Sequence, residues 1–265
     1  MKKYLVIGNP ITHSLSPELH NHWLRENSIN GTYNIEQLNE NDLKEFFLKI
    51  KKNQINGANI TVPFKKDVIS YVDQLSLEAE KTQSVNTVYL KNDKIIGHNT
   101  DIDGFELAIK DANYDVEGKK VLILGAGGVV PSIIFALYKM RVLSVTISNR
   151  TKTKAENLKS LFNDLKIIDW GEASSFDMII NATSIGLKKE DRLNLDFSKF
   201  KDSEFFYDVI YNPKETNFLK DARLRGNKTM NGQMMFLYQA KEAFKIWTGI
   251  TPEIDDKVIK ILDND

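Results

Sequence analysis

The sequence predicts a chain of two α/β domains with largely parallel strands. Short runs rich in β-branched residues alternate with helical patterns over the whole chain. The 265 residues, of which 42% are hydrophobic, are enough for two domains that each bury a core. A glycine-rich turn after the apolar run at residues 121–124 starts a second series of strands and helices.

The elements of the first domain follow in order. Strands are predicted at residues 4–8, 32–38 and 55–60, and helices between them at residues 16–27 and 41–52. Ser16 is expected as the N-cap of the first helix, with Pro17 at its first position. Residues 84–99 predict a hairpin that turns at Asn92 and Asp93, and a helix follows Asp101. We expect the domain boundary after Asp101.

Composition excludes several classes of function. The 36 basic and 36 acidic residues cancel, so nucleic acid is not an expected partner. The chain has no cysteine, which excludes disulfides, thiolate metal ligands and a cysteine nucleophile. The N-terminal apolar run is too short for a signal peptide, and no run approaches the roughly 20 residues of a membrane helix. We expect a soluble cytoplasmic protein without a membrane partner.

The turn at Gly125, Gly127 and Gly128 predicts a nucleotide site. Glycines permit close approach of a ligand to the backbone, and the N–H groups at a helix start attract a pyrophosphate. The strand before the turn and the helix after it favour this interpretation over a purely structural turn. The sequence departs from the dinucleotide pattern at Val130, which replaces a third glycine, and Pro131 is tolerable only in the first helical turn.

The end of the next strand indicates the cofactor. An NAD site places a carboxylate about 20 residues beyond the glycines, whereas this chain has Asn149, Arg150 and Thr151. Arg150 can pair with a 2′-phosphate, and Lys152 and Lys154 add positive charge. We therefore expect NADP rather than NAD. The alternative is that these residues are the exposed basic start of a helix.

Nine segments of the chain together resemble one known family. They occur in the family's order, as VIGNPITHSLSPELHN (6–21), NITVPFK (59–65), NT (86–87), GHNTDIDG (97–104), GAGG (125–128), NRT (149–151), NATSIG (181–186), DVIYNP (208–213) and NGQMMFLYQA (231–240). The chain resembles shikimate dehydrogenase from end to end. The resemblance implies an NADP-dependent oxidoreductase that reduces 3-dehydroshikimate to shikimate in aromatic amino-acid biosynthesis.

The resemblance also implies an arrangement of domains. Residues 1–101 would bind the substrate, residues 102–236 would form a Rossmann-like NADP-binding domain, and the helices of residues 237–265 would return to the substrate domain. The reaction would occur in the cleft between the two domains. A monomer or a homodimer is expected, with shikimate or 3-dehydroshikimate as the small-molecule substrate.

Site residues follow from the matched motifs. The resemblance implies a catalytic pair of Lys65 and Asp101. The substrate carboxylate would be held by Ser14, Ser16 and Tyr211, and the ring hydroxyls by Thr61, Asn86, Asp101 and Gln239. NADP would be bound by Gly125, Ala126, Gly127, Gly128, Asn149, Arg150, Thr151, Thr183 and Gly232. Each substrate residue has a structural alternative: Ser16 as a helix cap, Asn86 as part of a hairpin, Gln239 as an exposed helix residue.

Lys65 stands out within the stretch NITVPFKKD. Adjacent lysines alone are typical of a solvated surface, but a ketone that gains hydride also needs a proton at its oxygen. We expect Pro63 to begin a short helix with Lys65 in its first turn, where the helix dipole and Lys66 oppose a further positive charge and Asp101 favours it. Lys65 would exchange the proton, Asp101 would orient it, and Lys66 would face solvent.

Other chemistries fit the sequence less well. The histidines, His13, His20, His22 and His98, lack the spacing of a metal site, so no metal is expected. No G-x-S-x-G motif indicates an acyl-transfer serine, and we assign Asp103 to a helix start rather than a calcium loop. Two alternatives stay open. One is a relative that also oxidises quinate or uses NAD, and the other is a nucleotide sensor without catalysis.

Overall fold

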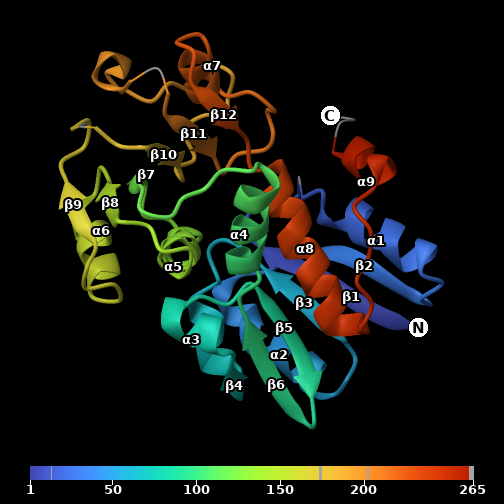
Figure 1. The fold of residues 1–265 in the computed structure, drawn as a ribbon. Helices are drawn as coiled ribbons and strands as arrows, with labels where there is room; N and C mark the ends of the chain where they lie inside the picture. The colour runs from blue at the N-terminus through green and yellow to red at the C-terminus, as the bar shows by residue number, and fades with distance from the viewer. Residues whose placement is uncertain (13, 173–174, 202, 263–265) are drawn as a thin grey trace. The chain divides into compact units, whose positions relative to one another are not determined.

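The computed structural model describes residues 1–12, 14–172, 175–201 and 203–262, which fold into two compact units, each built on its own sheet (Figure 1). Unit 1 comprises Met1–Asp103 and Leu237–Asp265, and unit 2 comprises Gly104–Phe236. Within the described residues, none of the helices is long and apolar enough to span a membrane.

Unit 1 is built on a mixed sheet. Its strands in the described residues run in the order β2-β1-β3-β5-β6-β4, with bounds β1 Lys2–Gly8, β2 Gly31–Gln37, β3 Gly57–Ile60, β4 Gln74–Leu75, β5 Thr87–Lys91 and β6 Lys94–His98. β1 pairs in parallel with β2 and β3, and β4 with β6, whereas β5 is antiparallel to β3 and β6. The predicted hairpin turns at Asn92 and Asp93, which both have positive φ.

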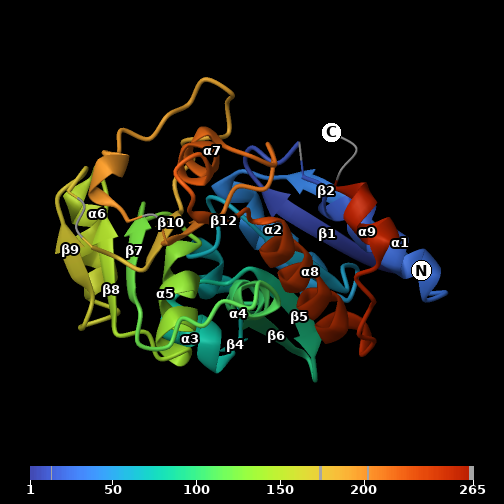
Figure 2. The same ribbon diagram turned by 45° about the horizontal axis from the view of Figure 1, so that its top comes forward.

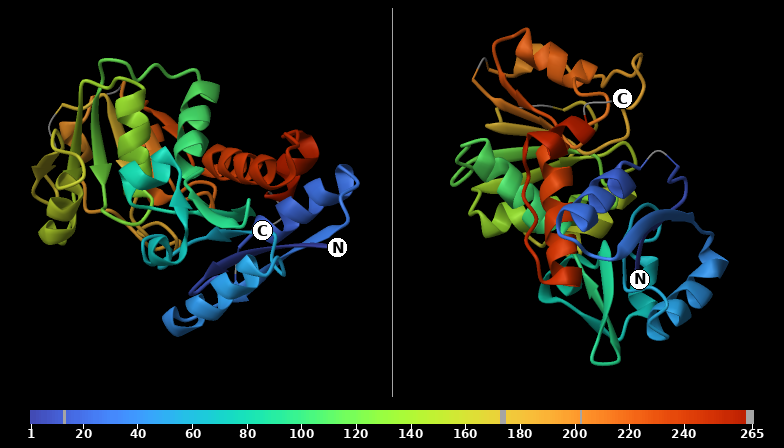
Figure 3. Two further views of the ribbon diagram at one scale, coloured as in Figure 1. Left: turned by 90° about the horizontal axis from the view of Figure 1, so that it is seen from below. Right: turned by 90° about the vertical axis from the view of Figure 1, so that its right-hand side faces the viewer.

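Helices cover both faces of this sheet (Figure 3). They are α1 Ser16–Glu26, η1 Glu40–Asp42, α2 Leu43–Lys51, η2 Asp67–Tyr71, α3 Leu77–Thr82, α9 Asp256–Ile261 and, from Leu237 onward, α8 Gln233–Thr248. Side chains alternate along β1: Leu5 and Ile7 pack into one cluster with Phe46 of α2, whereas Tyr4 stacks on Trp247 of α8 at 5.1 Å between ring centroids.

Unit 2 has a parallel sheet with the order β12-β11-β10-β7-β8-β9 in the described residues (Figure 2). The bounds are β7 Lys120–Leu124, β8 Ser144–Ser148, β9 Lys166–Ile168, β10 Met178–Asn181, β11 Phe205–Asp208 and β12 Lys228–Met230. When β7 to β12 are numbered 1 to 6 in chain order, the order across the sheet from β9 is 3-2-1-4-5-6. Doubly wound dinucleotide-binding sheets have this strand order. The sequence prediction of two largely parallel α/β folds is confirmed.

Helices also pack on both faces of the sheet of unit 2. They are α4 Asp101–Asp111, of which residues from Gly104 belong to this unit, α5 Val130–Lys139, α6 Lys152–Lys159, η3 Phe197–Lys199 and α7 Asn217–Arg223. Phe206 of β11 contacts Phe218 of α7 at 5.4 Å, and the next residue, Tyr207, contacts Phe105 of α4 at 5.3 Å. Neighbouring strand residues point to opposite faces, so α7 and α4 lie on opposite sides.

Two local predictions are wrong. Leu15 rather than Ser16 is the N-cap of α1, and Ser16 is the first residue of that helix. No helix begins at Pro63, because residues 62–66 form a turn and η2 begins only at Asp67. The Lys65 carbonyl accepts a hydrogen bond from the Val85 N–H at 2.8 Å, which joins this turn to the segment before β5. Lys65 therefore precedes the helix, and the expected dipole argument does not apply.

Candidate active site

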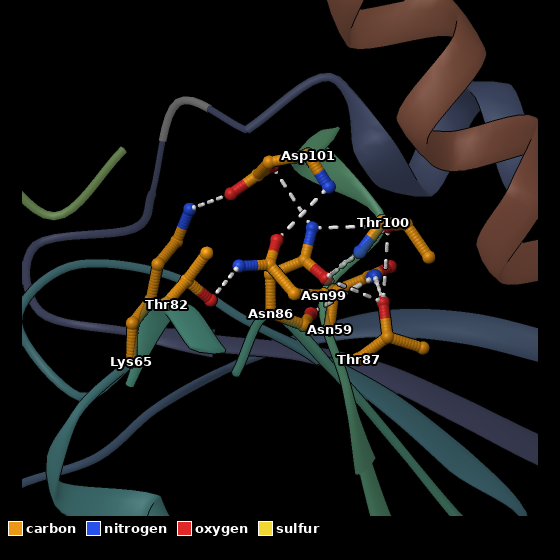
Figure 4. A network of polar contacts seen from close by, with 8 residues as sticks. All are labelled: Asn59, Lys65, Thr82, Asn86, Thr87, Asn99, Thr100 and Asp101. Atoms are coloured by element: carbon orange, nitrogen blue, oxygen red, sulfur yellow. Dashed lines mark hydrogen bonds and ion pairs between the residues drawn. The ribbon is translucent and has the colours of Figure 1, made fainter. Parts of the chain in front are cut away.

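Lys65 extends from the turn after β3 to the first residue of α4. Its Nζ donates a hydrogen bond to Oδ2 of Asp101 at 2.5 Å, and the two side chains are only 13% and 8% exposed (Figure 4). Lys66 is exposed, as expected. A mostly buried ion pair is held only when its remaining lone pairs find donors, so the surroundings of Asp101 decide whether this pair is ordered.

Two side chains donate to the carboxylate of Asp101, and its own N–H donates to a third. Nδ2 of Asn86 donates to Oδ1 at 2.9 Å, while Lys65 occupies Oδ2. The Asp101 N–H donates to Oδ1 of Asn99 at 3.2 Å, and Nδ2 of Asn99 donates to Oγ1 of Thr82 at 3.0 Å. Asp101 also begins α4, where the unpaired N–H groups favour a carboxylate. Both oxygens of the carboxylate are thus fixed in place.

Asn86 is almost fully buried, at 2% exposure. Its Oδ1 accepts hydrogen bonds from the Thr100 N–H at 2.8 Å and from the Thr87 hydroxyl at 3.0 Å, while its Nδ2 faces Asp101. Lys65 and Asn86, which the resemblance assigned to one site with Asp101, therefore each contact its carboxylate. The same arrangement brings in neighbours that the sequence analysis did not assign.

The other predicted substrate residues of unit 1 lie near the ends of its strands and on α8. Ser14 and Ser16 follow β1, and the Ser16 N–H donates to Oγ of Ser14 at 3.3 Å. Thr61 follows β3, which pairs in parallel with β1, and its N–H donates to the Ile7 carbonyl at 2.9 Å. The carboxyl ends of parallel strands form one edge, which is where α/β proteins bind ligands. Gln239 is partly buried on α8.

Tyr211 belongs to unit 2 and not to the unit that carries the serines. Its ring stacks on Phe236 at 4.7 Å between centroids. Gly232, predicted to bind the cofactor, lies close by in the same unit: a Cβ there would lie 2.0 Å from the Val209 carbonyl oxygen, and its N–H donates to the Ile210 carbonyl at 3.1 Å. The backbone contact therefore requires glycine at 232.

Two glycines of the glycine-rich turn, Gly125 and Gly127, differ in whether the fold itself requires glycine. Gly125 has φ of 109°, and a Cβ there would lie 2.7 Å from the Ala182 carbonyl oxygen, so the fold itself requires glycine. At Gly127 the nearest atom to an added Cβ is the same oxygen at 3.8 Å, which is an ordinary contact. The protein would accommodate a side chain there, so the space over Gly127 suits a ligand that approaches the backbone. Ala126 and Gly128 complete this turn, and Pro131 is tolerated in the first turn of α5 as predicted.

The loop after β8 carries the predicted 2′-phosphate residues. Nδ2 of Asn149 donates to the Thr151 carbonyl at 2.7 Å and closes the loop, and Arg150 between them is exposed. Thr151 is the N-cap of α6. Lys152 forms an ion pair with Asp169 at 3.2 Å, so part of its charge is already balanced and Arg150 is the stronger candidate for a phosphate.

A buried carboxylate organises the loop that contains Thr183. Asp208, at the end of β11, accepts hydrogen bonds from Nδ2 of Asn181 at 3.0 and 3.1 Å and from the Thr216 hydroxyl at 2.6 Å. Burial raises the pKa of Asp208 to about 6, against the opposing effect of these donors. The Thr183 hydroxyl donates to Oδ1 of Asn181 at 2.8 Å, so its side chain shapes the loop as well.

Histidines form no metal centre in the part of the chain that the structure describes, where no group of three candidate ligands is found. His13 lies outside the described residues. His20 is 1% exposed, and burial lowers its pKa to about 3. It stacks on Tyr33 with ring centroids 4.3 Å apart and planes at 6°. His20 is therefore a neutral member of the core.

Sequence reasoning missed several polar residues around Asp101 and Asp208. They are Tyr33, Asn59, Thr82, Thr87, Asn99, Thr100, Asn181, Asp208 and Thr216. A usable signal was present in Asn59, a polar residue inside a strand whose other residues are apolar or glycine. Such a residue needs a buried partner, which points to a polar network.

Three family descriptions match successive parts of the chain. They are "Shikimate dehydrogenase substrate binding domain" at residues 6–88, "Shikimate / quinate 5-dehydrogenase" at residues 106–209 and "Shikimate 5'-dehydrogenase C-terminal domain" at residues 235–256. The chain is 55% identical to a shikimate dehydrogenase (NADP(+)) of Pelagibacter ubique over 99% of both chains.

Solved structures agree with this match. The shikimate 5-dehydrogenase of Thermus thermophilus, in complex with NADP(H) and shikimate, has a TM-score of 0.87 at 30% identity and covers 99% of this chain and 98% of its own. The Listeria monocytogenes enzyme, in complex with shikimate and NAD, has a TM-score of 0.90 at 29% identity, with coverage of 99% and 96%. The similarity thus extends over the whole chain.

Proposed function

The chain belongs to the shikimate dehydrogenase family, and from this premise we propose how its own residues carry out the family's reaction. The protein is an NADP-dependent oxidoreductase that reduces 3-dehydroshikimate to shikimate in aromatic amino-acid biosynthesis. The observation that carries the assignment of roles is the contact of Lys65 with Asp101, because reduction of a ketone needs a proton donor held in place.

Lys65 supplies the proton in this proposal. When bound, NADPH supplies the hydride that reaches the carbonyl carbon. The Lys65 ammonium group donates a proton to the carbonyl oxygen, and in the direction of shikimate oxidation the neutral amine takes it back from the hydroxyl. Asp101 holds the ammonium group through Oδ2 and accepts from a neighbouring ring hydroxyl. General acid–base groups of this kind contribute about 10²–10⁴-fold to the rate.

Hydroxyl and amide groups hold the substrate. Ser14, Ser16 and Tyr211 are assigned to the carboxylate by their motifs, and Thr61, Asn86 and Gln239 to the ring hydroxyls. A small acid with several hydroxyls is recognised by many paired donors and acceptors, and an analogue that lacks one leaves a polar group unpaired. The position of Thr61 at the carboxyl end of β3, and of the two serines between β1 and the start of α1, supports this assignment.

The residues of unit 2 fit NADP. The open space over Gly127 and the helix start of α5 suit the pyrophosphate. Ala126 and Gly128 lie in the same turn, Thr183 follows β10 and Gly232 follows β12. Exposed Arg150, between Asn149 and Thr151, suits the 2′-phosphate. We therefore propose that residues 102–236 bind the cofactor, that residues 1–101 bind the substrate, and that residues 237–265 complete the substrate domain.

We also propose that the enzyme acts in the cytoplasm as a monomer or a homodimer, because its substrate and its cofactor are small polar molecules of that compartment. Cell fractionation and light scattering test both points.

An absorbance assay tests the function. Purified protein is mixed with shikimate or quinate and with NADP or NAD, and the NADPH or NADH band is followed. We expect turnover to be fastest with shikimate and NADP. Faster turnover with quinate or NAD would assign the protein to the broader relatives, and absence of turnover in every mixture would favour a nucleotide sensor.

A further inference from the structure

Four polar residues in the matched motifs have no role in the reaction described above: Asn59, Thr87, Asn99 and Thr100 (Figure 4). All four are at least 92% buried. Polar groups are kept in a protein interior when their hydrogen bonds are made, and the cost of an unmade one is high. The hydrogen bonds of Asn59, Thr87 and Thr100 lead to the Asn86 amide, which in turn holds Asp101.

The series of hydrogen bonds runs from Tyr33, which is fully buried and also has a side-chain hydrogen bond with Ser16. Its hydroxyl donates to Oδ1 of Asn59 at 2.7 Å. Burial raises the pKa of Tyr33 well above its ordinary value, so the phenol keeps its proton and remains a donor. Because Oδ1 of Asn59 accepts this bond, its Nδ2 faces the opposite way and donates to Oγ1 of Thr87 at 3.2 Å. Asn59 and Thr87 are register partners on the neighbouring strands β3 and β5.

The direction of donation continues through Thr87. A threonine hydroxyl has one hydrogen, and the oxygen of Thr87 accepts from Asn59. Oδ1 of Asn86, at 3.0 Å, is a nearer acceptor for that hydrogen than Oγ1 of Thr100, at 3.3 Å. The Thr100 N–H donates to the same oxygen at 2.8 Å. With Oδ1 accepting both, Nδ2 of Asn86 is directed to Oδ1 of Asp101 at 2.9 Å. The reversed amide would set its oxygen against the carboxylate.

We propose that Tyr33, Asn59 and Thr87 are positioning residues, which pass a fixed direction of hydrogen bonding to the Asn86 amide and so hold Asp101 and Lys65 in their catalytic geometry. The inference rests on the roles proposed for Lys65 and Asp101. None of the three residues needs to touch the substrate. Removal of any one donor takes away part of this restraint, while the bond from the Thr100 N–H to Oδ1 of Asn86 remains, and the loss appears at the proton-transfer step.

Thr87→Val is the central test, because valine keeps the shape of threonine and removes the hydroxyl. We expect kcat to fall roughly 10-fold, less than the loss expected on removal of the acid–base group itself, and the solvent deuterium isotope effect on kcat to rise. Thr87→Ser restores the hydroxyl and should restore kcat. The matched control is Thr146→Val, because Thr146 is also a buried strand threonine, 5% exposed, but lies in β8 of unit 2. It should change neither kcat nor the solvent isotope effect.

A merely structural role would give a different pattern. If Thr87→Val lowers the active fraction of the enzyme, kcat falls while the isotope effect stays at the wild-type value, and that result overturns the proposal. An unchanged kcat in a folded Thr87→Val enzyme overturns it as well. So does a Thr87→Ser enzyme that remains as slow as the valine variant.

A double-mutant test asks whether the residues act in series. Asn59→Asp replaces the donor with an acceptor of the same shape, and Tyr33→Phe removes the first hydroxyl. Each should lower kcat, and each combined with Thr87→Val should cost little beyond Thr87→Val alone, because each acts on the Asn86 amide through the Thr87 hydroxyl. The further bond of Asn59, to the Asn86 backbone carbonyl at 3.3 Å, does not orient that amide. Additive losses overturn the series.

Lys65→Met is measured in parallel to separate the two proposals. A Lys65→Met enzyme with wild-type kcat would overturn the catalytic assignment and the positioning chain together. A large loss in Lys65→Met with none in Thr87→Val would overturn only the chain.

Discussion

Lys65 and Asp101 are 36 residues apart in the chain, yet the ammonium group lies on one carboxylate oxygen while Asn86 already holds the other. Lys65→Met keeps most of the side-chain volume and removes the proton. We expect kcat to fall about 10²–10⁴-fold with a smaller change in substrate affinity, since the other ring contacts remain. Steady-state kinetics with shikimate and NADP measure both.

Lys66→Met is the matched control for this prediction, because it removes the same charge from the neighbouring exposed residue. Its kcat should stay within a few-fold of wild type. Asp101→Asn should lower kcat and raise KM together, since the carboxylate holds both Lys65 and a ring hydroxyl. Equal losses in Lys65→Met and Lys66→Met would show that the lysine pair acts through general charge.

Arg150 is expected to decide between the two nicotinamide cofactors. Arg150→Ala should raise the KM for NADP by about 10- to 100-fold, which is the roughly 1.5–3 kcal/mol of a charged hydrogen bond, and should leave the KM for NAD nearly unchanged. Lys154→Ala removes an exposed charge from the following helix, α6, and should change either KM much less. An equal loss with NADP and NAD in Arg150→Ala would show a structural role.

Gln239 is expected to bind substrate without supporting the fold. Its amide can donate and accept at once, so Gln239→Ala should raise the KM for shikimate by about 10-fold, which is the cost of one or two hydrogen bonds. The KM for NADP and the melting temperature should remain near wild type. A large drop in melting temperature with unchanged kinetics would contradict the assignment.

His20 should make the stability of the protein sensitive to acid. Its pKa of about 3 in the fold lies below the ordinary value of 6.5, so between these values the unfolded chain binds more protons than the folded one. The free energy of unfolding should therefore fall as the pH is lowered from 6.5 towards 3, by about 1.4 kcal/mol per pH unit from this residue.

The comparison that isolates this effect is His20→Leu against His22→Leu. Denaturant unfolding at a series of pH values should show a shallower acid loss in His20→Leu, even if that variant is less stable throughout. His22 is partly exposed on the same helix, so His22→Leu serves as the comparison variant that keeps the core histidine. The same slope in wild type and His20→Leu would refute the prediction.

Local rules predicted the parts of the fold that neighbours in sequence determine. The turn at Asn92 and Asp93 and the place of Pro131 in the first turn of α5 are examples. Where a helix was expected from Pro63, the chain forms a turn whose Lys65 carbonyl accepts from the N–H of Val85, which is distant in sequence. Local propensity alone does not predict a hydrogen bond between residues so far apart in the chain.

The candidate site shows the same limit. Motifs matched to a family named Lys65, Asp101 and Asn86, and the structure brings these three together. They gave no role to Thr87, although it lies beside Asn86 in the same motif. Its importance depends on the direction of a hydroxyl hydrogen, which only the partners in space decide.

The ring cluster around His20 includes Phe244 and Trp247, which come from the far end of the sequence. During synthesis, a ribosome releases these residues long after the strands of unit 1 have emerged, whereas unit 2 is one uninterrupted segment. On chains truncated after Phe236 and released from the ribosome, we expect protease resistance in unit 2 and none in unit 1. The domain that is made first would therefore be the one completed last.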